Sequence, residues 1–274
     1  MKKTLVLLCV CLGVFTACNL GKDKSKAIEY FQSGVAKDSI KNYQGAIMDY
    51  NKAIEIDPKY TTAYLKRGFA KYQMKDYRGS IGDFNKAIEI DPKYAKAYYS
   101  RGYVKYDLQD YRAANADFNK AIEYDPKDTQ AYNSRGHLRF DLHDYRGSLA
   151  DFTKTIEANS NDAIAYYNRG FDEYYLPDCQ GAIADYNRAL EINPKYTDAY
   201  IWRGKSKALC KDYAGQIADC NKAIELDPGN AKAYINMGVA KISIGQKVSG
   251  CEDLNKGKEL GYKHADEIID QYCR

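Results

Sequence analysis

Hydrophobic and polar positions repeat along the chain with a period of 34 residues. Written in rows of that length from Ala27, the sequence aligns without a gap through His264 and fills seven rows. Column 8 of every row is glycine, and column 4 of every row is tyrosine. A fixed period of this size indicates one supersecondary unit copied in tandem. The seven predicted repeats are residues 27–60, 61–94, 95–128, 129–162, 163–196, 197–230 and 231–264.

Recurring start and stop signals divide each row into two predicted helices. Most rows end in an Asp-Pro or Asn-Pro pair, and the residue before proline disfavours the α region. Near the middle of most rows, an Asn or Asp stands where an N-cap would open the second helix. Each row is therefore predicted to be helix, turn, helix. The expected N-caps are Asn42, Asp76, Asp110, Asp144 and Asp212, and the stop pairs begin at Asp57, Asp91, Asp125, Asn193 and Asp227.

Side-chain size also follows the rows. Columns 20 and 27 are mostly small, whereas column 24 is mainly aromatic. Small residues at helical spacing let two helices approach closely, and large rings fill the gaps between them. We expect the column 24 rings to pack between the helices and the column 4 tyrosines to be buried. Column 24 holds Tyr50, Phe84, Phe118, Phe152 and Tyr186, followed by Cys220 and Leu254.

The last row and the residues after it differ from the rest. Gly250 and Gly257 occupy the small columns of the last row, as suits the terminal unit of an open array. Residues 265–274 then place apolar side chains on one stripe of a helix. We predict that this helix caps the exposed face of the last hairpin, with a partner-binding helix as the alternative. The stripe consists of Ala265, Ile268, Ile269, Tyr272 and Cys273.

The small, glycine, aromatic and proline columns at this period resemble the tetratricopeptide repeat, over nearly all of residues 27–264. The resemblance implies an all-α, right-handed superhelical solenoid with a concave groove lined by the first helix of each hairpin. That groove is the usual surface on which such repeats hold a peptide or partner protein. Three departures are Ser160 in place of proline, Pro177 in the turn of row five, and Gln216 at a small column. We expect those hairpins to pack less regularly.

Opposite charges recur at two fixed columns. Arginine fills column 7 in five rows, and aspartate fills column 23 in all seven. Antiparallel helices joined near column 16 bring these columns to about the same height, so each Arg is predicted to pair with an Asp of its own hairpin or the preceding one. A ligand-binding arginine ladder is the alternative. The residues are Arg67, Arg101, Arg135, Arg169 and Arg203, with Asp49, Asp83, Asp117, Asp151, Asp185, Asp219 and Asp253.

Columns 5, 9 and 12 share one face of the first helix, on a different side from columns 4, 8 and 11. In rows two to five this face is mainly Phe and Tyr, whereas rows six and seven have no aromatic there, although Trp202 stands at the adjacent column 6. The aromatics are either a binding surface or part of the packing. If they bind, Phe69, Tyr103 and Phe171 should be substantially exposed. The candidate groove residues are Phe69, Tyr72, Tyr99, Tyr103, Tyr106, His137, Phe140, Tyr167, Phe171 and Tyr174.

The charge balance and the N-terminal segment bear on the compartment. Lys and Arg number 41 against 37 Asp and Glu, a balance that does not favour binding to nucleic acid.

Residues 1–17 are predicted to be a secretory leader, with an apolar stretch too short to span a bilayer. The junction from Val14 to Cys18 resembles the lipobox of bacterial lipoproteins, apart from Phe15 where Leu is usual. The resemblance implies lipidation of Cys18, a polar tether to residue 26, and a membrane lipoprotein of the bacterial cell envelope, periplasmic or at the cell surface. Ordinary leader cleavage is the alternative.

Residue chemistry does not favour catalysis. The three histidines are scattered, and no Cys-x-x-Cys pair, phosphate-binding glycine loop or Gly-x-Ser-x-Gly motif occurs. We predict a protein that is not an enzyme, with no cofactor and no metal.

Folding the last two helices antiparallel about Gly261 puts Cys251 and Cys273 on nearly equal arms, which predicts a disulfide in an oxidising envelope. The pairing stays open for Cys179, Cys210 and Cys220.

These features favour a scaffold or adaptor of the envelope that binds partner proteins or peptides in the concave groove. The alternative is a receptor for a glycan or a lipid, in which the same aromatics stack on the ligand. Capture from crosslinked envelopes distinguishes the two, because a scaffold recovers defined proteins and a glycan receptor does not.

Overall fold

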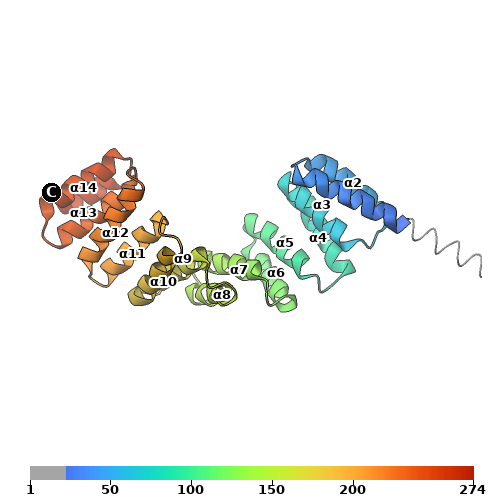
Figure 1. Ribbon diagram of the computed structural model, residues 1–274, viewed down its shortest axis with the longest axis horizontal. Helices are drawn as coiled ribbons and strands as arrows, with labels where there is room; N and C mark the ends of the chain where they lie inside the picture. Colours follow the sequence, from blue (N-terminus) through green and yellow to red (C-terminus); the bar gives the residue numbers. More distant parts are fainter. Residues whose placement is uncertain (1–22) are drawn as a thin grey trace, which may run out of the picture. The chain divides into compact units, whose positions relative to one another are not determined.

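A computed structural model describes residues 23–274, and all of the regular secondary structure in that range is helical (Figure 1). The first described helix spans residues 23–39. The expected leader and Cys18 lie outside the described residues. Within residues 23–274, no helix has both the length and the apolar character needed to cross a membrane.

The helices follow the period of the sequence and form a solenoid of consecutive pairs. Helices that are neighbours along the chain pack together, as α3 with α4 and α13 with α14 do. The first helices begin at column 1, namely α3 (Thr61–Gln73), α5 (Ala95–Asp107), α7 (Thr129–Asp141), α9 (Ala163–Tyr175), α11 (Thr197–Leu209) and α13 (Ala231–Ser243). The second helices begin at column 17, namely α2 (Tyr43–Ile56), α4 (Tyr77–Ile90), α6 (Tyr111–Tyr124), α8 (Tyr145–Ala158), α10 (Cys179–Ile192), α12 (Tyr213–Leu226) and α14 (Lys247–Glu259), and α15 (Ala265–Cys273) follows them.

The predicted caps and stops are confirmed. The Asp76 side chain accepts a hydrogen bond from the Gly79 amide at 2.9 Å, which satisfies one of the unpaired N–H groups at the start of α4. At the other end of a hairpin, Asp57 before its proline has left the helical region, with φ of −124° and ψ of 90°. The same N-cap bond forms at Asn42, Asp110, Asp144 and Asp212.

The column 24 aromatics lie at the centre of their hairpins. The exposed fraction of Tyr50, Phe84 and Phe118 is 0%. The column 8 glycine lies against this ring: a Cβ atom on Gly68 would stand 2.6 Å from a ring carbon of Phe84. A larger residue at that column would force the two helices of the hairpin apart.

The expectation that the column 4 tyrosines are buried is wrong for all but Tyr64, which is 8% exposed. In rows two to six, the arginine of column 7 lies one turn further along the same helix, and its guanidinium lies over the tyrosine ring. The Arg101 Cζ atom, for example, is 5.4 Å from the Tyr98 ring centroid. In those five rows the tyrosine ring therefore lies against an arginine, whereas in row one the Tyr30 ring lies under Lys52. The half-buried tyrosines are Tyr30, Tyr98, Tyr132, Tyr166, Tyr200 and Tyr234.

All three departures from the repeat pattern leave the helix boundaries regular. α8 ends at Ala158, at the same column as the other second helices, although Ser160 replaces proline. Gln216 is only 4% exposed at its small column. The boundaries of these helices therefore match those of the other rows. Pro177 has φ of 27°, in the left-handed region that the same turn position adopts in the other rows.

The described helices group into two compact units, divided after Ala131. In the N-terminal unit, the buried cluster includes Phe84, Leu65 and Val104. The C-terminal unit has one buried cluster at Tyr186 and another at Leu254. Each unit thus has apolar cores of its own.

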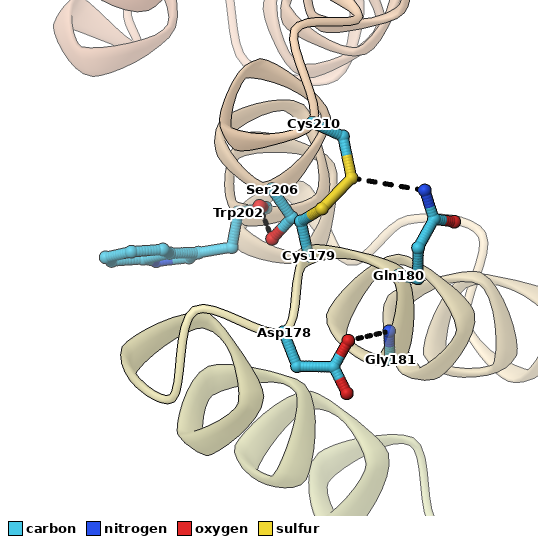
Figure 2. The surroundings of a disulfide bond; sticks show 7 residues. All are labelled: Asp178, Cys179, Gln180, Gly181, Trp202, Ser206 and Cys210. Carbon is cyan, nitrogen blue, oxygen red and sulfur yellow. Dashed lines mark hydrogen bonds between the residues drawn. A yellow bond between two sulfur atoms is a disulfide. The ribbon is translucent and has the colours of Figure 1, made fainter.

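Two disulfides lie in the C-terminal unit. Cys251 and Cys273 form the predicted disulfide, which joins α14 to α15. Their Cα atoms are 5.8 Å apart, inside the range that disulfides require. Apolar side chains of α15 pack against Leu254, so this helix covers the last hairpin. The second bridge joins Cys179, at the start of α10, to Cys210, at the end of α11, again with Cα atoms 5.8 Å apart (Figure 2).

Candidate binding surface

The arginine and aspartate columns pair within their own hairpins. Arg67 donates two hydrogen bonds to the Asp83 carboxylate, and the Lys71 ammonium lies 2.8 Å from the same group. Asp83 is 4% exposed, so these cations compensate its burial. Because each guanidinium is engaged in this way, the arginines do not form a free ladder for a ligand. The pairing recurs at Arg101–Asp117, Arg135–Asp151, Arg169–Asp185 and Arg203–Asp219.

In the N-terminal unit, the column 9 aromatics differ in exposure. Tyr103 is 39% exposed, as expected for a binding residue. Phe69 is only half-buried, and the expectation of substantial exposure is wrong for it. Its ring meets the buried Phe84 ring edge-on at a centroid distance of 5.6 Å, so one part of Phe69 belongs to the core and another part to the surface.

Several candidate residues of this unit line one hollow. Phe69, Tyr72, Tyr99 and Tyr103 contribute to a concavity of about 510 Å³, together with Gln130. The Tyr72 ring stands edge-on to Tyr103 at 6.0 Å, and the Tyr72 hydroxyl donates a hydrogen bond to a carboxylate of α5. We refer to these four aromatics as the N-terminal aromatic surface.

In the C-terminal unit, the aromatic side chains contact one another. Phe171 is half-buried, because its ring lies 5.0 Å from Phe140 and 4.4 Å from Trp202. The expectation of substantial exposure is therefore wrong for Phe171 as well. Tyr175 is 42% exposed and lies edge-on to Phe140 at 5.4 Å. We refer to Phe140, Phe171, Tyr174, Tyr175 and Trp202 as the C-terminal aromatic surface.

Trp202 and Tyr175 belong to this surface but fall outside columns 5, 9 and 12. Trp202 packs edge-on against Phe171 and Tyr174, with centroid distances of 4.4 and 5.2 Å. Figure 2 shows its indole extending from α11, away from the disulfide. Two features of the sequence pointed to Trp202: it is the chain's single tryptophan, and it adjoins the aromatic columns.

The remaining candidates lie outside these two aromatic surfaces. Tyr167 stacks on Tyr196 at 4.8 Å, and burial raises its pKa, so it serves the packing between hairpins. His137 is exposed and lies edge-on to Phe152 at 5.2 Å. Tyr106 packs against Tyr111 at 5.6 Å. Among residues 23–274, no three His, Cys, Asp or Glu side chains are arranged to hold a metal ion.

Comparisons with known proteins agree with the period of the sequence. A family model described as TPR repeat matches residues 29–75 and 70–109. Two models described as tetratricopeptide repeat match residues 95–128 and 172–231. No curated protein matches the chain.

Solved structures share the fold at low sequence identity. YrrB, described as a TPR protein with an unusual peptide-binding site, is 22% identical with a TM-score of 0.63, and the match covers 67% of this chain and 95% of YrrB. A tetratricopeptide repeat protein from Parabacteroides merdae is 17% identical with a TM-score of 0.62, over 91% of this chain and 100% of its own. The C-terminal part of a TPR repeat-containing protein from Cytophaga hutchinsonii is 19% identical with a TM-score of 0.71, over 87% of this chain and 99% of its own. With the helix pairs and the family matches, these likenesses show that the chain belongs to the tetratricopeptide repeat family.

Proposed function

We propose that this chain is a non-catalytic scaffold of the bacterial envelope, which binds segments of partner proteins on its N-terminal and C-terminal aromatic surfaces. The observation that carries the proposal is the exposure of Tyr103 and Tyr175, at 39% and 42%, beside rings that the core already fixes. Rigid, part-exposed aromatics provide contact area at a low entropy cost, as binding hot spots do. The peptide-binding site of YrrB, a protein of the same fold, supports a peptide ligand.

The test uses Tyr103→Ala and Phe171→Ala, with capture of partners from crosslinked envelopes. We expect each variant to weaken capture of the same defined proteins by ~1 kcal/mol or more, as truncation of a binding anchor does. Leu142→Ala is a matched control, because Leu142 is 51% exposed but lies outside both aromatic surfaces.

Thermal melting separates binding from packing. Truncation of a fully buried aromatic costs ~3–5 kcal/mol of stability, whereas Tyr103 is too exposed for a loss of that size. A large fall in the melting temperature of the Tyr103→Ala variant, with capture unchanged at low temperature, would show that the ring belongs to the core. Recovery of glycans or lipids in place of proteins would favour the receptor alternative.

A further inference from the structure

A small hollow of about 110 Å³ lies in the C-terminal unit, beside the C-terminal aromatic surface. α11 contributes Trp202 and Lys205 to its lining, α13 contributes Lys232 and Asn236, and Tyr262 closes it from the turn before α15. With Asp198 and Ile201, also on α11, the hollow joins two basic side chains, one carboxylate, one amide, one aliphatic chain and two aromatic rings. Its volume is that of a few water molecules, which suits a single small polar group.

The two lysines of this hollow have no acidic partner among the residues that the structure describes. The Lys205 ammonium lies 4.0 Å from the Trp202 ring centroid and is half-buried. Burial lowers the pKa of Lys205, and the charge of Lys232 lowers it further. Asp198 also lines the hollow but forms no ion pair with either lysine.

The other lysines of the same two helices are paired, in contrast to Lys205 and Lys232. Lys207 on α11 lies 2.8 Å from the Asp219 carboxylate, and Lys241 on α13 lies 2.6 Å from its own aspartate. Those ion pairs hold each hairpin together. Lys205 and Lys232 are placed side by side without such a partner, so an anion entering the hollow removes their repulsion and gains charge-assisted hydrogen bonds.

The surroundings indicate which anion fits. Trp202 continues into Phe171 and Tyr174 on one side of the hollow. On the other side, α13 carries Val239 and Ile242 at columns 9 and 12, which pack in part against the core of the last hairpin and are only partly buried. An extended segment that follows this surface therefore has apolar contacts before and after the hollow, and it presents a side chain, not a chain end, to the lysines.

We propose that the hollow binds the side-chain carboxylate of an Asp or Glu in the middle of a partner peptide, between Lys205 and Lys232, with apolar residues to either side. This inference rests on the proposed function and adds the charge of the partner to it. Neighbouring first helices are ~8–10 Å apart, and an extended chain advances about that far in three residues. The expected ligand therefore has an apolar residue about three positions before and after the acid.

The experiment uses two pools of heptapeptides, acetylated and amidated, with Phe or Leu at both ends and either Glu or Gln at the centre. Trp202 is the chain's single tryptophan, so its fluorescence reports binding at this place. We expect the Glu pool to bind about tenfold more tightly than the Gln pool, and more weakly as salt is raised. Lys205→Met should abolish the difference between the pools, and Lys232→Gln should reduce it.

Lys96→Gln is the matched control, because Lys96 occupies the same column as Lys232 in the N-terminal unit and its loss changes the net charge equally. Lys205→Arg keeps the charge and should retain the preference, which excludes a mere folding effect. Equal binding of both pools, or no binding of the Glu pool, overturns the inference. If both pools bind equally and Phe171→Ala abolishes their binding, peptide recognition survives and only the acidic preference is wrong.

Two further probes separate the sources of the anion. A Gln-centred pool with a free C-terminal carboxylate tests a chain end, and inorganic phosphate tests a free ion. Binding of either one as tightly as the Glu pool contradicts the assignment to an acidic side chain.

Discussion

At the scale of single residues, two adjacent acids of α9 occupy columns that are otherwise apolar, small or basic. Asp172 stands at column 10 and Glu173 at column 11, where every other row has Lys or Arg. Asp172 is fully buried. Burial raises the pKa of Asp172 to about 7, against a lowering by the nearby Ser148 hydroxyl. Burial and the charge of Asp185 likewise raise the pKa of Glu173.

These pKa shifts predict that the protein is more stable in mild acid. The folded state holds the Asp172 proton up to about pH 7, whereas the unfolded chain releases it near pH 4, so the free energy of unfolding falls as the pH rises between them. At ~1.4 kcal/mol per pKa unit, Asp172 contributes at most about 4 kcal/mol to this change. Urea denaturation at pH 5 and pH 8 measures it.

The other rows supply the matched substitutions. Asp172→Ala and Glu173→Lys introduce residues found at the same columns elsewhere, as in Ala70 and Lys71. We expect both to raise stability at pH 8 and to reduce its dependence on pH. Glu29→Lys, at an exposed position, is the control for the change in charge. An Asp172→Ala variant with an unaltered pH dependence would show that Asp172 is not the titrating group.

At the scale of elements, the turn inside each hairpin needs a residue in the left-handed region at column 15. The φ angle there is 61° at Lys41 and 84° at Gly245. Row five has Pro177, whose ring favours φ near −65° but which here has φ of 27°. This turn is therefore strained, and the Cys179–Cys210 disulfide ties the helix that follows it to α11 (Figure 2).

Pro177→Gly is expected to raise the melting temperature, because glycine adopts positive φ without a steric cost. Relief of the strain contributes ~1–3 kcal/mol. The greater entropy of the unfolded chain offsets ~0.4–1 kcal/mol of that gain. Lys211→Gly is the control, at φ of 65° in the next row, and should change stability little. Thermal melting with the disulfides intact measures both, and a lower melting temperature for Pro177→Gly would refute the claim of strain.

At the scale of the whole molecule, the chain has two compact units, each with its own buried clusters and its own aromatic surface. The proposed place in the envelope rests on the N-terminal sequence, where the junction at Cys18 resembles a lipobox. An anchored chain keeps its partners near a membrane. That expectation concerns residues outside those that the structure describes.

Lipidation of Cys18 is testable without a structure. We expect the wild-type chain to incorporate a labelled fatty acid and to fractionate with membranes, and Cys18→Ser to do neither. Cys220→Ser is a control for loss of a thiol, because Cys220 is the free cysteine among the described residues. A wild-type chain that takes up no label and is released in soluble form would exclude the anchor.

The sequence by itself determined the repeat, the helix boundaries, the caps and the charge pairs, because these depend on contacts that recur in every row. Asp76 caps its own helix three residues away, and Arg67 meets Asp83 at a separation set by one hairpin. Cys251 and Cys273 were also predictable from the sequence, because a single antiparallel turn brings them together.

Only the tertiary structure decided how far each groove ring is exposed and which lysines lack a partner. Tyr103 and Phe171 share one column, yet Tyr103 is 39% exposed whereas Phe171 is half-buried against Trp202 of the next hairpin. The hollow at Lys205 likewise combines side chains of different hairpins. The period of the sequence describes one hairpin at a time, whereas packing between hairpins depends on the particular side chains that meet there.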